Sequence, residues 1–157
     1  MLTGKKLAAE LYRSVFEDPW HGSSLKEILD NCSAAKVYQR PVKDAHNIIE
    51  LVLHLNSWTE EIISRLEDNP PSEPAQGDWP TPAKETEEYW NETTSKFYSG
   101  TKMLISILEN ISDEKLNKMI GEERSPEFGT GYTAGEMVIG LLQHNAYHAG
   151  QISLLNK

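Results

Sequence analysis

The segment that decides the fold of this chain is MVIGLLQHNAYHAGQI, at residues 137–152. Its apolar residues recur at helical spacing, so the sequence predicts one helix here. His144 and His148 are four residues apart and therefore project from the same face of that helix. Met137 and Leu141 share this face, which indicates that both imidazoles point into the core. Buried polar groups need partners, and a metal ion is a partner that suits imidazole.

The bulk composition describes one acidic domain. A length of 157 residues suits a single domain over residues 1–157 and is enough to bury a core without disulfides or metals. A formal net charge of −9 argues against nucleic acid and against an anionic membrane surface as partners. We expect no membrane span, because no apolar run is long enough, and no signal peptide. Cys32 is the single cysteine and fits a reducing compartment, so a cytoplasmic location is expected.

Four long helices are predicted from apolar residues that recur at helical spacing. They cover residues 2–17, a segment from Asp44 or Asn47 to about Leu66, residues 83–110, and the segment that follows Thr133. Thr133 and Glu136 have the spacing of a capping box, which marks the start of the last helix. No segment shows a convincing strand-like alternation. The prediction is an all-α protein, a four-helix bundle with short extra helices and a Pro-rich loop.

The connections between these helices are expected to be less regular. A short helix is predicted to run through Asn31 and a short turn through Met119. Residues 33–43 are expected to form a connector. The polar, Gly-rich residues 120–131 are expected to form an excursion such as a small hairpin.

The longest predicted loop covers residues 68–82, which hold five prolines and Gly77. Proline cannot continue a helix, and a loop of this length in a compact domain is often a functional cover. Trp79 is expected to anchor the loop on the helices. Whether the loop covers a site or faces a partner is open at this stage.

A third metal ligand has to come from another histidine, because catalytic zinc-type sites use three protein ligands and leave one position for water. The candidates are His21 in a turn, His46 in the first turn of a helix, and His54 in the middle of that helix. Helix bundles build their sites from facing helices, which favours His54. From spacing alone, a metal site and a set of core histidines that are satisfied by other partners stand about even.

Two motifs in this order carry a family resemblance. DAHNIIELVLHLNSW at residues 44–58, followed by QHNAYHAGQI at residues 143–152, resembles the DinB-like (YfiT-like) superfamily. The Trp20-His21-Gly22 turn before SLKEILD at residues 24–30 adds to the resemblance, which covers most of the chain. It implies a four-helix bundle, often a homodimer, with a divalent metal that is held by His54, His144 and His148.

The resemblance also implies a range of activities. The superfamily includes bacillithiol-, mycothiol- and glutathione-dependent transferases and isomerases, as well as members without known activity. We therefore expect a metal-dependent enzyme that acts on a small molecule, as a thiol-dependent S-transferase or a hydrolase. Zinc and nickel are the metals expected first, although the sequence does not distinguish them from manganese or iron, because imidazole suits several of these ions. A low-molecular-weight thiol is the expected second cofactor.

Two further residues are candidates for catalytic roles. Glu50, one turn before His54, is a candidate general base or hydrogen-bond partner of a ligand. Gln151, close after His148, is a candidate for orienting that imidazole or a bound substrate. The alternatives are a non-catalytic bundle or stress-response module that a metal only stabilises, and an interaction protein without metal.

Overall fold

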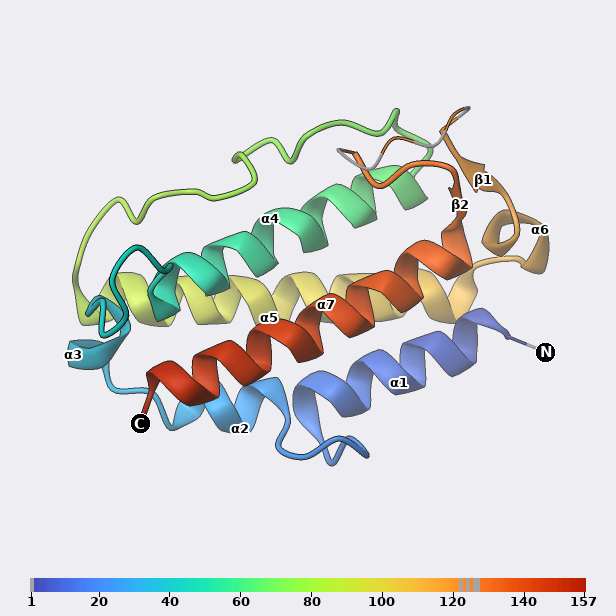
Figure 1. Cartoon of the computed structure of the whole chain (residues 1–157). Helices are drawn as coiled ribbons and strands as arrows, with labels where there is room; N and C mark the ends of the chain where they lie inside the picture. The colour runs from blue at the N-terminus through green and yellow to red at the C-terminus, as the bar shows by residue number, and fades with distance from the viewer. Residues whose placement is uncertain (1, 122, 124, 126–127) are drawn as a thin grey trace.

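The computed structural model describes residues 2–121, 123, 125 and 128–157, and these residues are mostly helical (Figure 1). The long helices are α1 (Gly4–Phe16), α4 (Ile48–Leu66), α5 (Glu87–Asn110) and α7 (Ala134–Leu155). The short helices are α2 (Leu25–Asp30), α3 (Ala34–Val37) and α6 (Asp113–Leu116). The two short strands are β1 (Met119–Ile120) and β2 (Tyr132–Thr133). The prediction of an all-α protein with short extra helices is confirmed. None of the described helices combines the length and the apolar character that a membrane crossing needs.

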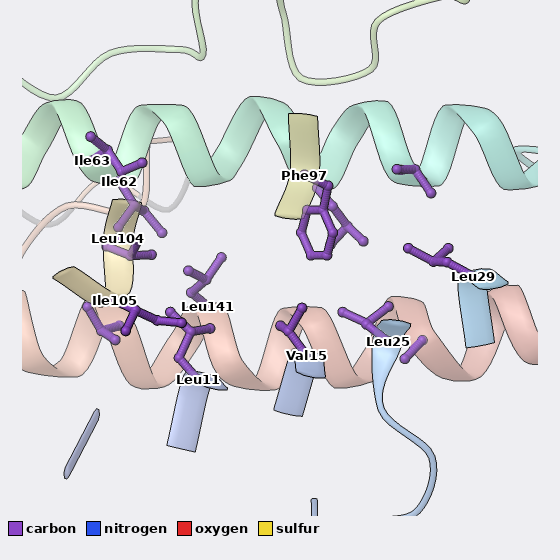
Figure 2. Close-up of a cluster of buried hydrophobic side chains, with 14 of the residues drawn as sticks. Leu11, Val15, Leu25, Leu29, Ile62, Ile63, Phe97, Leu104, Ile105 and Leu141 are labelled. Atoms are coloured by element: carbon purple, nitrogen blue, oxygen red, sulfur yellow. The ribbon is translucent and has the colours of Figure 1, made fainter. Parts of the chain in front are cut away.

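The four long helices pack in a closed ring, in which α1 contacts α5, α5 contacts α4, α4 contacts α7 and α7 contacts α1 (Figure 1). Apolar side chains from these helices and from α2 meet inside the ring (Figure 2). Solvent essentially does not reach the side chains of Phe97 and Leu104 in α5 or those of Leu11 and Val15 in α1. Each such side chain contributes about 1.5–3 kcal/mol when it is fully buried. This core fixes how α4 and α7, which carry the histidines, lie relative to each other.

Both histidine-bearing helices begin at a capping box. In α4, the Asn47 side chain accepts from the Glu50 N–H while the Glu50 carboxylate accepts from the Asn47 N–H. In α7, Thr133 and Glu136 form the same reciprocal pair, as predicted. Such caps satisfy N–H groups that a helix start leaves unpaired and are worth about 1 kcal/mol each. They fix where each helix starts and so which residues share its inner face.

The structure corrects the predicted start of the third long helix and the predicted connector. The third long helix was predicted from residue 83, but α5 begins at Glu87, because the Thr86 side chain caps it by accepting from the Tyr89 N–H at 3.2 Å. The connector predicted over residues 33–43 contains the short helix α3. The hairpin expected at residues 120–131 has strands that flank most of that segment, where Met119 pairs with Thr133 and Ile120 pairs with Tyr132. Residues 122, 124, 126 and 127 of that prediction lie outside the described residues.

The Pro-rich connection between α4 and α5 spans residues 67–86 and is called the Pro-rich loop below. It leaves the C-terminal end of α4 and runs back along the outside of that helix to the start of α5 (Figure 1). Ser72 ties the first part of the loop to α4, because its N–H donates to Glu61 at 2.9 Å and its carbonyl accepts from Arg65 at 3.1 Å. The next part lies against the histidines.

Candidate metal centre

Three imidazoles converge between α4 and α7. His54 comes from the middle of α4, and His144 and His148 come from successive turns of α7. The Nε2 atom of His144 lies 2.8 Å from Nε2 of His54 and 3.0 Å from Nε2 of His148. One ring nitrogen from each residue lies within 4.8 Å of the others, so the three could hold one metal ion. The predicted ligand set is therefore brought together by the fold.

The proton on His54 is fixed by the Pro-rich loop. Nδ1 of His54 lies 2.6 Å from the backbone carbonyl oxygen of Asp78. A carbonyl can only accept, so Nδ1 carries the proton and donates it. The Nε2 lone pair is then left to face the other two histidines. The Asp78 carboxylate is held in turn by the Trp58 indole, whose Nε1–H donates to it at 2.7 Å.

Gln151 performs the corresponding task for His148. Its side-chain oxygen accepts from Nδ1 of His148 at 2.5 Å, and its amide nitrogen donates to the Tyr147 hydroxyl at 3.3 Å. His148 therefore also presents an unprotonated Nε2 to the cluster. Gln151 lies where a residue that orients this imidazole was expected.

Trp79 covers His54 on one face. The two rings are stacked, with centroids 3.8 Å apart and planes 5° apart. His46 stacks on the opposite face of Trp79 at 3.7 Å. The anchoring role that was predicted for Trp79 thus has a specific place, between a cluster histidine and His46. This sandwich shields one side of His54 from water.

Glu50 belongs to the support of this sandwich and lies outside the histidine cluster. Its carboxylate accepts hydrogen bonds from the Arg40 guanidinium and, at 3.1 Å, from the Asn47 N–H. The carboxylate also lies 3.2 Å from Nδ1 of His46. Burial alone would raise the pKa of Glu50, but these hydrogen bonds outweigh it and lower the pKa. The carboxylate is therefore ionised and occupied by partners. A role as general base stays a prediction, and the described contacts connect Glu50 to the cluster through His46 and Trp79.

The three cluster histidines are neutral near pH 7. Burial lowers the pKa of His54 and of His148, and burial together with the neighbouring imidazoles lowers the pKa of His144 to about 4. Metal ligands have to be deprotonated, so this state is the one that binds a cation. Two lone pairs with fixed direction, aimed at a third imidazole about 3 Å away, form a donor set that fits a divalent ion.

Sequence reasoning missed Asp78, although it contacts a predicted ligand directly. It lies in a loop, where no periodicity indicates which way a side chain or a carbonyl points. The contact becomes visible only when the loop is placed along α4. The signal for Glu50 was present, since Asn47 and Glu50 have capping-box spacing.

We expect His46→Ala to keep the full metal content. His46 packs on the outer face of Trp79 and is not among the residues of the cluster. Elemental analysis of the purified variant should give the same metal-to-protein ratio as the wild type, as should the matched control His21→Ala in the α1–α2 turn. Loss of the metal from His46→Ala alone would mean that the wrong histidine of this region has been assigned.

Comparison with known proteins supplies one match. Residues 20–152 match the sequence model of the DinB superfamily. No curated protein and no solved structure matches the chain. The matched range includes all three histidines of the cluster and the whole of the Pro-rich loop.

Proposed function

The chain belongs to the DinB superfamily, and from this membership and the three-histidine cluster we propose that it is a metal-dependent enzyme acting on a small molecule. The reaction is a thiol-dependent S-transfer or a hydrolysis. The observation that carries the proposal is the convergence of three Nε2 atoms, two of them with their lone pairs directed inward by hydrogen bonds at Nδ1.

His54, His144 and His148 would hold the ion, with zinc or nickel expected first. Such an ion supplies Lewis acidity and lowers the pKa of a bound thiol or water. The surrounding residues keep the ligands in place: Asp78 and Gln151 fix the protons on two of the rings. Trp79 excludes water from the flat side of His54.

The thiol in such a reaction would have to be a separate molecule. Cys32, the single cysteine of the chain, is buried, and its Sγ donates to the Ile28 carbonyl. Burial raises the pKa of this thiol to about 11, so it is not a thiolate at neutral pH. If the reaction is an S-transfer, a low-molecular-weight thiol is therefore needed as the second cofactor.

A cavity beside the cluster supports catalysis over a purely structural metal. Structural zinc sites are closed by four protein ligands, whereas catalytic sites keep one position open. Here His54 and His144 both line a cavity of about 630 Å³. The alternative, a stress-response bundle or interaction module that a metal only stabilises, would not need this space. A cytoplasmic location and a homodimer stay predictions from the sequence.

The test is a titration of the cobalt-loaded protein with 2-mercaptoethanol, followed by visible and near-ultraviolet absorption. If the fourth position is open to a thiol, we expect a saturable sulfur-to-cobalt absorption band and a change in the cobalt spectrum. His148→Ala is the control and should show neither the protein-bound cobalt spectrum nor the band. A cobalt spectrum that 2-mercaptoethanol does not change would contradict S-transfer and leave hydrolysis as the reaction.

A further inference from the structure

The cavity beside the cluster is elongated along α4 and α7. On α4 its lining starts at His54 and continues one turn at a time to Arg65. From residue 54 to residue 65, at 1.5 Å per residue, this face is about 16 Å long. On α7 the lining runs back from His144 towards Glu136, at the end of the helix next to β2 (Figure 1). A volume of about 630 Å³ lies within the range of small-molecule sites.

Most of the wall between these ends is apolar. The wall includes Trp58 and Ile62 of α4 and Met137 and Leu141 of α7. The side chains of Ile62, Met137 and Leu141 are largely buried, so the wall is a continuation of the hydrophobic core. An apolar molecule gains free energy by leaving water for such a wall, in proportion to the area that it buries.

The described charged side chains that line the cavity offer no net positive charge to a ligand. Arg65 lies at the far end from the cluster, and its Nε donates to the carboxylate of Glu61 at 2.7 Å. Both side chains are buried, so the guanidinium charge is balanced within the protein. The other charged residues of the described lining are two carboxylates, Asp78 beside His54 and Glu136 on α7. An anionic tail at the far end would meet the Glu136 carboxylate, and none of the described residues of the lining offers an unpaired cation there.

We propose that this cavity binds an elongated, uncharged and mainly apolar small molecule, whose polar head reaches the metal between the three histidines. The inference rests on the proposed function for the metal and adds the substrate class. The metal end would hold the reacting group, and the apolar wall would hold the body of the molecule.

Gly140 provides a way to close the cavity without touching the ligands. It lines the cavity one turn before His144, and a Cβ built on it meets no atom within 4 Å. Gly140→Leu therefore places a side chain in the cavity without a clash at the Cβ, and it improves the helix propensity of α7. Gly150→Leu is the matched control, because Gly150 is also an exposed glycine of α7 with no atom within 4 Å of a built Cβ, and it does not line the cavity.

The first experiment compares acetohydroxamate with octanohydroxamate on the zinc-loaded protein by calorimetry. Both carry the same metal-binding head, and each buried methylene of the longer probe adds roughly fourfold in affinity. We expect octanohydroxamate to bind roughly 50-fold tighter or better in the wild type and in Gly150→Leu. In Gly140→Leu the gain should fall to about threefold or less while zinc stays bound. Equal gains in the two glycine variants, or no gain in the wild type, would overturn the proposal.

The second experiment tests the charge of the ligand. Suberic acid monohydroxamate has the same head and the same chain length, but it ends in a carboxylate. We expect it to bind roughly tenfold weaker than octanohydroxamate, because its carboxylate finds no uncompensated cation among the lining residues that the structure describes. Binding that is as tight as, or tighter than, that of octanohydroxamate would overturn the uncharged substrate class.

A further experiment distinguishes failure of the cavity proposal from failure of the proposed metal site. If the protein binds no metal, acetohydroxamate will not bind, and the cavity is then tested with 1-octanol by thermal unfolding of the metal-free protein. A stabilisation that Gly140→Leu loses and Gly150→Leu keeps would support the apolar ligand even then. No stabilisation of the wild type by 1-octanol would overturn the cavity proposal by itself.

Discussion

His144→Ala should abolish tight binding of a divalent metal while the helices still fold. His144 is the central residue of the cluster, since its Nε2 lies within 3.0 Å of Nε2 in both His54 and His148. Its removal leaves two ligands. Loss of a residue that only hydrogen-bonds a ligand costs up to roughly 100-fold in metal affinity, so the loss of a ligand itself should cost more. Competition with a chromophoric chelator measures the affinity.

Without metal, the free energy of unfolding of the His144→Ala variant should be at most about 1 kcal/mol lower than that of the wild type. In the metal-free wild type, the neutral His144 can donate one Nε2–H to the inward-facing lone pairs of His54 and His148, so its removal loses a hydrogen bond worth about 1 kcal/mol. Circular dichroism and urea unfolding of both proteins in the presence of a chelator measure this. Stoichiometric, tight metal in His144→Ala would exclude the ligand set.

Arg65→Met should lower the free energy of unfolding by about 3–5 kcal/mol at neutral pH. Arg65 and Glu61 form an ion pair on α4 in which both side chains are almost completely buried. Without the guanidinium, Ser72 is the remaining partner of the buried Glu61 carboxylate among the residues that the structure describes, and the Ser72 carbonyl loses its donor. Urea unfolding followed by circular dichroism measures the change.

The matched control replaces both members of the pair, Glu61→Leu together with Arg65→Met. Two apolar side chains of similar volume remove the buried charge along with its partner, so the double variant should lose less than half as much as the single variant. A single variant that loses no more than about 1 kcal/mol, the value of an exposed pair, would show that this pair is solvated in the folded protein.

The sequence was most informative where periodicity and capping act locally. The helical spacing of His144 and His148, and the Thr133 capping box, predicted the start and the inner face of α7. The choice of His54 as the third histidine followed from the rule that sites in bundles come from facing helices, and from the family resemblance. The fold brings that histidine to the other two.

Long-range contacts of loop residues could not be predicted in the same way. Nothing in the local sequence indicates that the Asp78 carbonyl reaches His54, or that Trp79 fits between two imidazoles. These contacts depend on the path of the Pro-rich loop along α4. The loop therefore contacts the candidate site directly, which answers one of the questions that the sequence left open.

Elemental analysis of the purified, untagged wild type beside His54→Ala is the decisive test of a metal ion held by the three histidines. We expect one divalent metal ion per chain in the wild type and a background level in His54→Ala. The absence of metal from the wild type after supplementation with zinc and with nickel would contradict the claim, and so would an unchanged metal content in His54→Ala.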